Sequence, residues 1–202
     1  ADDDRKQVLD LLARETDRLD SLVGRVLELS RLESGAHAYM RERLDVRDLV
    51  DESIAVFDAH TLSHPTPIET HLDSDLVVIG DRDTLVRALA NLLVNAWKYT
   101  GDEKHITVSA RTAHRWIEIV VRDNGVGIPR EEQRSIYEQF TRGRAAHASG
   151  APGVGLGLAL VRTIVRGHRG KLDFDSRPGE TSFRIRLKRR REPASTAALV
   201  AS

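Results

Sequence analysis

The sequence predicts an α+β fold: a two-layer α/β sandwich with a mixed, mostly antiparallel sheet and helices on one face, preceded by one long amphipathic helix. Two observations support this prediction. Apolar residues recur at three- and four-residue intervals over residues 4–33, as in an amphipathic helix. Farther along, segments with helical spacing are interspersed with short β-rich runs, two of which are adjacent as in a hairpin.

The first predicted helix carries a long apolar stripe. The stripe consists of Val8, Leu11, Leu12, Leu19, Leu22, Val23, Val26, Leu27, Leu29 and Leu32. Gly35 is expected to close the helix, because glycine adopts the left-handed conformation without strain. Each buried leucine or valine stabilises a fold by roughly 1.5–3 kcal/mol. We therefore expect the stripe to pack on a helix outside this chain, in a homodimer.

The remaining elements follow a linker. Helices are predicted at residues 47–60, 81–99 and 158–168, and strands at residues 67–72, 76–79, 105–112, 115–122, 171–175 and 182–187. Asp81 is expected to cap the helix at 81–99, and Ala113 with His114 to form the hairpin turn. The predicted organisation is a helical segment at 1–35, a linker at 36–43, a domain at 44–190 and a flexible tail at 191–202.

Composition excludes several classes of function. The 31 basic and 31 acidic side chains balance, so the charge gives no reason to expect nucleic acid as a partner. The absence of cysteine excludes disulfide scaffolds and thiolate zinc sites, and it fits a reducing, cytoplasmic location. The apolar runs are far shorter than the ~20 residues that span a bilayer, so no membrane contact is expected from this segment.

Asn91, Asn95 and Lys98 are expected to share one face of the helix at 81–99, because they lie four and three residues apart. The buried face is predicted to consist of Leu85, Leu89, Leu92 and Leu93. Magnesium prefers oxygen ligands and takes few from the protein when phosphates supply the rest, and a lysine can neutralise phosphate charge. The polar face therefore suits a metal–triphosphate, although the spacing alone also fits an ordinary solvated helix face.

A carboxylate, Asp123, follows the strand at 115–122 directly and precedes Gly125 and Gly127. At the end of a buried strand, a carboxylate can accept a hydrogen bond from the exocyclic amine of adenine. Guanine has a carbonyl in that place, so the site would select ATP over GTP. Glycines would let the backbone approach a flat base. An ordinary Asp-Asn-Gly turn is the alternative.

A glycine-rich run at residues 153–158 opens the last predicted helix, after a loop at 142–152. Backbone N–H groups at such a helix start form an anion site. A dinucleotide-binding loop is excluded, because a loop precedes the run in place of the first strand of a βαβ unit. A Walker loop is excluded too, because no Gly-Lys-Ser/Thr follows.

Together these motifs resemble the four boxes of the histidine-kinase catalytic domain, a Bergerat-type ATP-binding fold shared with gyrase, mismatch-repair and chaperone ATPases. The N box is similar to residues 91–99, the first glycine box to 123–129, the F box to 136–142 and the second glycine box to 153–158. The segment at 179–183 is similar to the family's Gly-Thr-x-Phe end, except that Glu180 replaces a glycine before Thr181. Residues 15–35 resemble the second helix of the dimerisation and phosphoacceptor hairpin.

The resemblance implies roles for individual residues. Asn95 would bind Mg²⁺, Asn91 and Lys98 would lie at the phosphates, and Asp123 would bind the adenine. The other nucleotide contacts would come from Tyr99, Gly125, Gly127, Ile128, Phe140, Gly153, Val154, Gly155, Leu156, Gly157, Leu158 and Thr181. Phe140 would anchor a mobile lid, roughly residues 141–152, from which Arg142 would reach a phosphate; a solvated Arg142 is the alternative.

The resemblance also implies phosphoryl transfer in preference to hydrolysis. In relatives that hydrolyse ATP, a glutamate base occupies the position of Asn91, and an amide cannot accept a proton at neutral pH. The family's acceptor is a histidine followed by an acidic residue, and none of the 8 histidines here precedes one. We therefore expect a kinase core that begins after its own phosphoacceptor helix and does not phosphorylate itself.

Such a core would belong to a sensor histidine kinase of a bacterial two-component system, using ATP and Mg²⁺ and relaying phosphate to the receiver domain of a response regulator. The whole protein would be cytoplasmic, or anchored in the inner membrane by segments outside these residues. An anti-sigma-type serine kinase or ATP-binding regulatory module is the alternative, disfavoured because that class lacks a helix like 4–33. A degenerate structural domain is disfavoured by the intact motifs.

Overall fold

The computed structural model describes residues 2–35, 37–62, 64–141 and 154–190, and it confirms the α+β prediction. The elements in chain order are α1 (Asp2–Glu33), β1 (Glu42–Asp45), α2 (Val46–His60), β2 (Ile68–Leu72), β3 (Val77–Gly80), α3 (Arg82–Tyr99), β4 (Ile106–Ala113), β5 (Trp116–Asp123), α5 (Gly157–Gly167), β6 (Lys171–Arg177) and β7 (Glu180–Lys188). Every predicted helix and strand is present, with ends shifted by a few residues. Gly35, at φ 70°, follows the end of α1 as predicted.

The main sheet has five strands in the order β2-β4-β5-β7-β6. β2 runs parallel to β4 and the other pairings are antiparallel, so the sheet is mixed and mostly antiparallel. The β4–β5 hairpin turns through His114 and Arg115, one residue later than predicted, because Ala113 still pairs with Trp116 in the ladder. His114 adopts φ 57° to close this tight turn.

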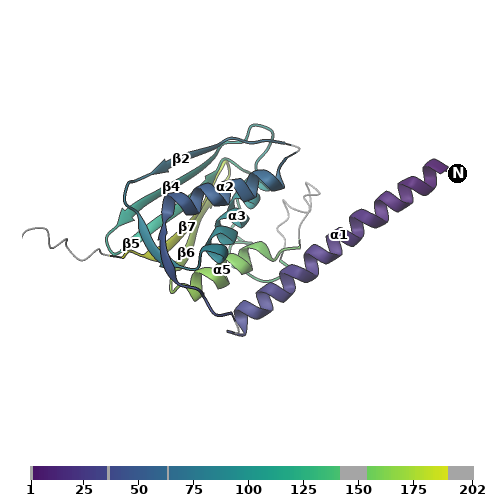
Figure 1. Cartoon of the computed structure of the whole chain (residues 1–202). Helices are drawn as coiled ribbons and strands as arrows, with labels where there is room; N and C mark the ends of the chain where they lie inside the picture. The colour runs from purple at the N-terminus through teal and green to yellow at the C-terminus, as the bar shows by residue number, and fades with distance from the viewer. Residues whose placement is uncertain (1, 36, 63, 142–153, 191–202) are drawn as a thin grey trace, which may run out of the picture.

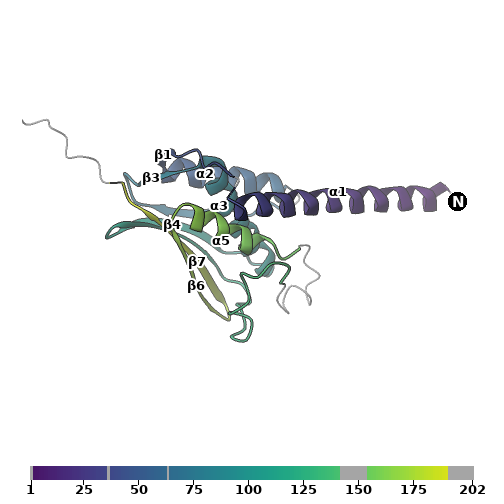
Figure 2. The ribbon, with the colours of Figure 1, turned by 90° about the horizontal axis from the view of Figure 1, so that it is seen from below.

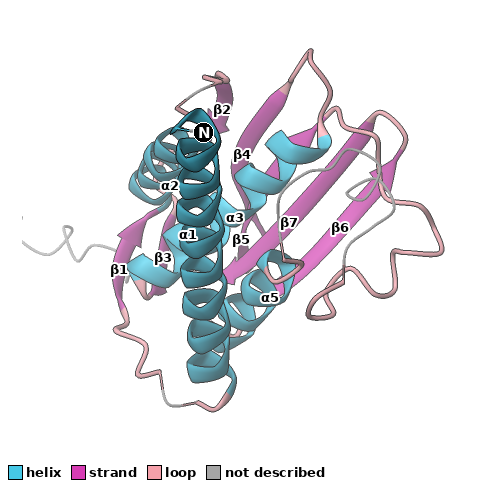
Figure 3. Ribbon diagram, turned by 90° about the vertical axis from the view of Figure 1, so that its right-hand side faces the viewer, coloured by secondary structure: helices cyan, strands magenta, loops and turns pink. Residues whose placement is uncertain are grey.

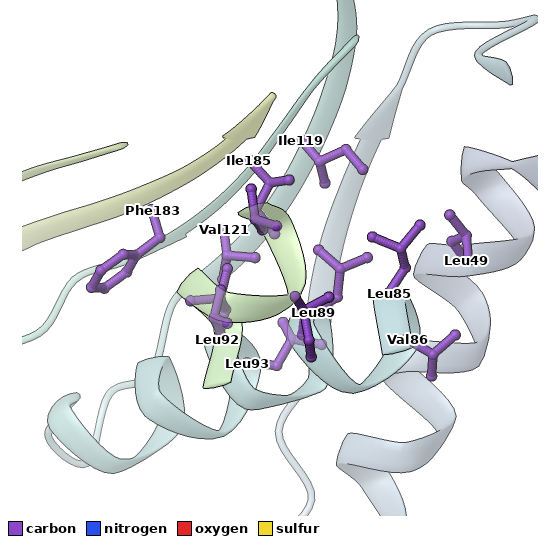
Figure 4. Close-up of a cluster of buried hydrophobic side chains, with 14 of the residues drawn as sticks. Leu49, Leu85, Val86, Leu89, Leu92, Leu93, Ile119, Val121, Phe183 and Ile185 are labelled. Carbon is purple, nitrogen blue, oxygen red and sulfur yellow. The ribbon is translucent and has the colours of Figure 1, made fainter. Parts of the chain in front are cut away.

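Helices α2, α3 and α5 cover one face of the sheet (Figures 2 and 3). The predicted apolar face of α3 is buried and meets side chains from the central strands (Figure 4): Leu85, Leu89, Leu92 and Leu93 against Ile119, Val121, Phe183 and Ile185. The predicted cap is also present, because the Asp81 carboxylate accepts the Thr84 N–H at 3.0 Å. This packing fixes α3 above β5, which is the arrangement that the site requires.

A second, two-stranded sheet of β1 and β3 was not predicted. β1 is only four residues long, and Leu44 is its one buried residue, so no alternating pattern marks it. It begins within the segment predicted as a linker at 36–43. The residues before it also contact the domain: the Met40 N–H donates to Asp81 Oδ2 at 2.9 Å, and Tyr39 packs edge-to-face on His168. This connection is therefore attached to the domain.

Helix α1 extends well beyond the rest of the molecule (Figure 1). Near its C-terminal end Leu29 and Leu32 are buried, and the helix packs on α5. Farther out, four residues of the predicted stripe are exposed, namely Leu12, Leu19, Val23 and Leu27. Leu9, which the predicted stripe did not include, is exposed as well. None of the helices in the described ranges combines the length and apolar character needed to cross a membrane.

Candidate functional site

Two adjoining cavities lie along α3. The inner cavity, of about 220 Å³, reaches the ends of β5 and β7, and the outer cavity, of about 440 Å³, reaches the last turn of α2 and the start of α5. Both are lined by Asn95, Tyr99, Ile136, Thr141 and Leu158. Because these residues are shared, the two cavities form one elongated site.

The inner cavity contains a buried carboxylate between apolar walls. Asp123 ends β5, and the register of the sheet places Thr181 of β7 directly opposite it. The Asp123 side chain is only 5% exposed, while Ile128 and Phe183 contribute apolar surface to the cavity. This environment suits a flat, largely apolar ring that carries a hydrogen-bond donor.

Burial raises the pKa of the Asp123 carboxyl to about 6, while the hydrogen bond from the Gly125 N–H to Oδ1, 2.9 Å long, opposes the rise. At neutral pH the group is therefore ionised but poorly solvated. An ionised carboxylate only accepts hydrogen bonds. A ligand that donates one to Asp123 would restore the solvation that burial removed.

Gly125 and Gly127 lie where a side chain would collide with neighbouring backbone. An added Cβ would lie 2.5 Å from the Tyr99 carbonyl oxygen at Gly125, and 2.5 Å from the Arg177 carbonyl oxygen at Gly127, which also has φ 78°. The close approaches are thus to the protein itself, whereas the sequence suggested an approach to the base. Both glycines hold the first glycine box between the end of α3 and the β6–β7 turn.

The outer cavity combines the polar face of α3 with the start of α5. Asn91, Asn95 and Lys98 all line it, as predicted. A Cβ on Gly157 would lie 3.2 Å from Asn91 Oδ1, so the first turn of α5 faces the two amides. Among the described residues no side chain caps α5, so the N–H groups of its first turn could bind an anion. No carboxylate is found among the described residues that line this cavity.

Most of the predicted site residues line one cavity or the other. The outer cavity is lined by Asn91, Asn95, Lys98, Tyr99, Val154, Gly155, Leu156, Gly157 and Leu158, and the inner cavity by Asn95, Tyr99, Asp123, Gly127, Ile128, Leu158 and Thr181. Gly125 instead contacts Asp123. Arg142, Gly153 and most of the predicted lid lie outside the described residues.

Phe140 contacts a different part of the molecule from the one the resemblance implied. Its side chain is 57% exposed and lines a groove beside α1 together with Leu29. The Phe140 N–H donates to the Gly155 carbonyl at 3.1 Å, which joins the residues on either side of the segment 142–153. Phe140 thus anchors the ends of that segment through its backbone.

Several residues that line or support the site were not found from the sequence, and three of them are polar residues from α1, α2 and β6. Arg25 of α1 and His60 of α2 line the outer cavity, and Ser176 of β6 hydrogen-bonds both Thr181 Oγ1 and the Ile128 N–H. Arg25 and His60 lie outside the four boxes, so no motif marks them. Ser176 pairs with Thr181 in the ladder and could have been found only if the strand register had been known.

The described residues fit a magnesium site with one protein ligand. No group of three or more His, Cys, Asp or Glu side chains in the described ranges could hold a metal, which argues against a carboxylate cage. Asn95 lies where the two cavities meet. Its amide oxygen is the kind of ligand that Mg²⁺ accepts when phosphates and water complete the octahedron.

Comparison with known proteins agrees with this geometry. The model of the histidine kinase-, DNA gyrase B-, and HSP90-like ATPase family matches residues 80–191. Sensor-like histidine kinase SenX3 of Mycobacterium tuberculosis is 36% identical over 168 residues, which are 83% of this chain and 41% of SenX3. The probable sensor histidine kinase TcrY of the same organism is 37% identical over 177 residues, which are 87% of this chain and 37% of TcrY.

Solved structures agree as well. The mycobacterial sensor histidine kinase MprB superimposes with a TM-score of 0.63 at 30% identity, covering 76% of this chain and 100% of that chain. Full-length ShkA in complex with AMPPNP shares the fold, with a TM-score of 0.79 at 21% identity over 94% of this chain and 40% of that chain.

The chain spans only about two fifths of the length of these curated relatives, 41% of SenX3 and 37% of TcrY. The family model nevertheless covers more than half of the 202 residues and contains both cavities' residues on α3, β5 and α5. The chain therefore belongs to the family of histidine kinase-, DNA gyrase B- and HSP90-like ATPases, and it carries the ATP-binding domain that sensor histidine kinases share.

Proposed function

We propose that this chain is the ATP-binding catalytic core of a sensor histidine kinase and donates the γ-phosphate of ATP to a histidine of a dimerisation hairpin. The adenine would lie in the inner cavity with its exocyclic amine on Asp123. The phosphates would run along α3 into the outer cavity, between Asn91, Asn95 and Lys98 and the start of α5. Membership of the family supports the ATP part of this proposal.

The observation that carries the choice of transfer over hydrolysis is that the described lining of the outer cavity holds no carboxylate to serve as a general base. The described residues lining the outer cavity include no carboxylate, and residues 142–153 contain no aspartate or glutamate in their sequence. Asn91 cannot take a proton from water at neutral pH. The site is equipped to position and neutralise phosphates, which is most of what phosphoryl transfer to a supplied acceptor requires.

Asn95 would be the protein ligand that holds Mg²⁺ beside the phosphates. When bound, the metal would neutralise charge that develops on the transferred phosphoryl group. Lys98 would add a point charge at the phosphates, and the α5 N–H groups would orient them. These contributions act together with Asp123, which fixes the base at the opposite end.

The acceptor histidine would be supplied by a hairpin outside this chain, and the phosphoryl group would pass on to the receiver domain of a response regulator. The exposed leucines and valines of α1 support pairing with a second copy of the chain through this helix. Because ATP and receiver domains are available in the cytoplasm, we place the working protein there, with any anchor in other segments.

The proposal is tested by mixing the chain with γ-labelled ATP, Mg²⁺ and a separate hairpin that contains the acceptor histidine. We expect acid-labile, base-stable label on the hairpin, lost with Asp123→Asn and retained with Asp102→Asn, an exposed aspartate next to α3 that serves as the matched control. Acid-stable phosphoserine on another protein would point to a serine kinase. Rapid release of inorganic phosphate without transfer would point to a hydrolase.

A further inference from the structure

Arg25 of α1 lines the outer cavity but not the inner one, which contains Asp123. Asn95 lines both cavities, whereas Asn91, one helical turn or about 5.4 Å earlier on α3, lines only the outer one. Arg25 and Asn91 also line a smaller cavity together with Gly157. A nucleotide with its base at Asp123 and its phosphates along α3 would therefore bring its terminal phosphate beside Asn91 and Arg25.

This end of the site is electropositive. Three basic side chains from three helices line the outer cavity: Arg25 of α1, His60 of α2 and Lys98 of α3. Burial lowers the pKa of His60, and the nearby charges of Lys98 and Arg25 lower it further. Arg25 and Lys98 thus lie close enough to disfavour a positive charge on His60, and the described lining of the outer cavity contains no carboxylate. A polyanion would offset these charges.

Contacts in the turns that follow Arg25 attach this part of α1 to the domain. One turn after Arg25, Glu28 pairs with Arg87 of α3 and Leu29 is buried. At the end of α1, Glu33 accepts a hydrogen bond from Gln139 Nε2 at 3.0 Å. Glu28 is thus paired with Arg87, and Arg25 lines the outer cavity from a helix that precedes the catalytic domain.

We propose that Arg25 binds the terminal phosphate of ATP, so that α1 is held on the catalytic domain by ATP and released when the nucleotide is ADP. The inference rests on the proposed function for the orientation of the nucleotide. A guanidinium can bind two phosphate oxygens at once, unlike the ammonium of Lys98. ADP lacks the phosphate that Arg25 would bind. The contact therefore depends on the third phosphate, and so does the preference for the docked position of α1.

The test is the ratio of ADP to ATP dissociation constants, measured calorimetrically with Mg²⁺ on the full chain. In Arg25→Gln we expect the ATP constant to rise about tenfold, as for loss of one charge-assisted contact, and the ADP constant to change less than about twofold. Arg31→Gln removes the same charge from an exposed position of α1 and should change neither constant. Arg25→Lys, which keeps the charge but not the fork, should lie between.

The outcomes separate failure of this inference from failure of the proposed function. If Arg25→Gln leaves both dissociation constants unchanged while the wild-type chain binds ATP, the inference is overturned and the proposed function stands. Equal losses of ATP and ADP would also overturn it, because Arg25 would then act elsewhere than at the terminal phosphate. A wild-type chain that binds neither nucleotide would overturn both. Circular dichroism of each variant shows whether a loss of binding comes from a loss of fold.

Discussion

At the scale of single residues, the ionised carboxylate of Asp123 would favour binding of a hydrogen-bond donor but lowers the stability of the folded protein. The folded-state pKa of about 6 lies above the ordinary value of 3.8, so the folded protein pays a penalty for the ionised form. The penalty is absent below pH ~4, develops between pH ~4 and ~6, and is complete above that range. In the proposed function, the adenine amine would bind this same ionised form.

We therefore predict that Asp123→Asn weakens ATP binding and stabilises the protein without ligand. Loss of a hydrogen bond to a charged acceptor should reduce ATP affinity about ten- to hundredfold and remove the preference over GTP. At pH 8 the free energy of unfolding should rise by roughly 1–3 kcal/mol, since one pKa unit is worth ~1.4 kcal/mol, and the gain should shrink at pH 5. Calorimetry and urea unfolding measure the two effects. A variant that binds ATP normally would show that the base lies elsewhere.

Replacing Gly127 tests whether a glycine is required at this position by the packing of the surrounding backbone. Gly127→Ala places a Cβ 2.5 Å from the Arg177 carbonyl oxygen at a backbone φ of 78°. Because both the contact and the conformation are unfavourable, we predict a loss of about 2–4 kcal/mol in stability, measured by urea unfolding. Gly101→Ala is the matched control, since nothing lies within 4 Å of an added Cβ there. Equal stability of the two variants would contradict the packing role.

The sequence could identify those site residues that stand close together in short motifs. Asp123, Asn95 and Lys98 stand in dense motifs within one helix or one strand–loop junction, and the structure brings them to the same elongated site. Arg25 and His60 reach that site from two other helices. From the sequence alone, an arginine on an amphipathic helix is predicted to be solvated. Its actual surroundings depend on tertiary packing, which the local spacing of residues does not encode.

At the scale of elements, His168 joins the end of α5 to the start of α3. Its Nε2 accepts the Asp81 N–H at 2.9 Å and its Nδ1 donates to the Ile164 carbonyl at 2.8 Å, a pattern that requires the neutral ring. Burial lowers the pKa of His168 from its ordinary value of 6.5. Because the unfolded chain then binds the proton more tightly, the stability that the neutral ring provides is present above pH ~6.5 and is lost as the pH falls below it.

We predict that His168→Gln lowers the free energy of unfolding by about 2–3 kcal/mol at pH 8, because buried hydrogen-bonding groups lose their partner. The difference from wild type should narrow between pH 7 and pH 5. His105→Gln, at an exposed histidine, should show neither effect. Comparing urea unfolding of the variants cancels the other titrating groups, including Asp123, whose contribution has the opposite sign. A pH-independent difference would mean that His168 is not held neutral.

The elements that the sequence predicted carry either a repeated apolar pattern or, as in β3, a continuous apolar run of β-branched residues. The helices and the central strands carry several repeats of an apolar pattern, and all of them are present. β1 has four residues and one buried side chain, Leu44, so its pairing with β3 could not be predicted. The hairpin turn was displaced by one residue because Ala113 and His114 are less distinctive than an Asn-Gly turn.

At the scale of the whole molecule, α1 lines the site through Arg25 and also extends beyond the domain (Figure 1). The sequence predicted an amphipathic helix, but not that its last turns would dock on the catalytic domain through Leu29, Leu32 and the Glu28–Arg87 pair. An apolar stripe shows that a helix must pack, without identifying its partner. Here part of the stripe packs on the domain and part remains exposed.

If Arg25 binds the terminal phosphate only when α1 is docked, thermodynamic reciprocity fixes the reverse effect: ATP must favour docking over ADP by the same factor by which docking favours ATP. With a tenfold preference, corresponding to ~1.4 kcal/mol, a half-docked population with ADP would become about nine-tenths docked with ATP. Because the chain has no cysteine, Thr16→Cys on α1 and Asp51→Cys on α2 can be spin-labelled without background.

We predict that the distance distribution between these labels narrows toward one separation with the ATP analogue AMPPNP and broadens with ADP. Arg25→Gln should make the two distributions alike, whereas Arg31→Gln should preserve the difference. The variant tests the coupling itself, because both nucleotides still occupy the site through Asp123 and Asn95. A nucleotide-dependent change that persists in Arg25→Gln would show that another contact, such as Glu33 with Gln139, transmits the state of the nucleotide to α1.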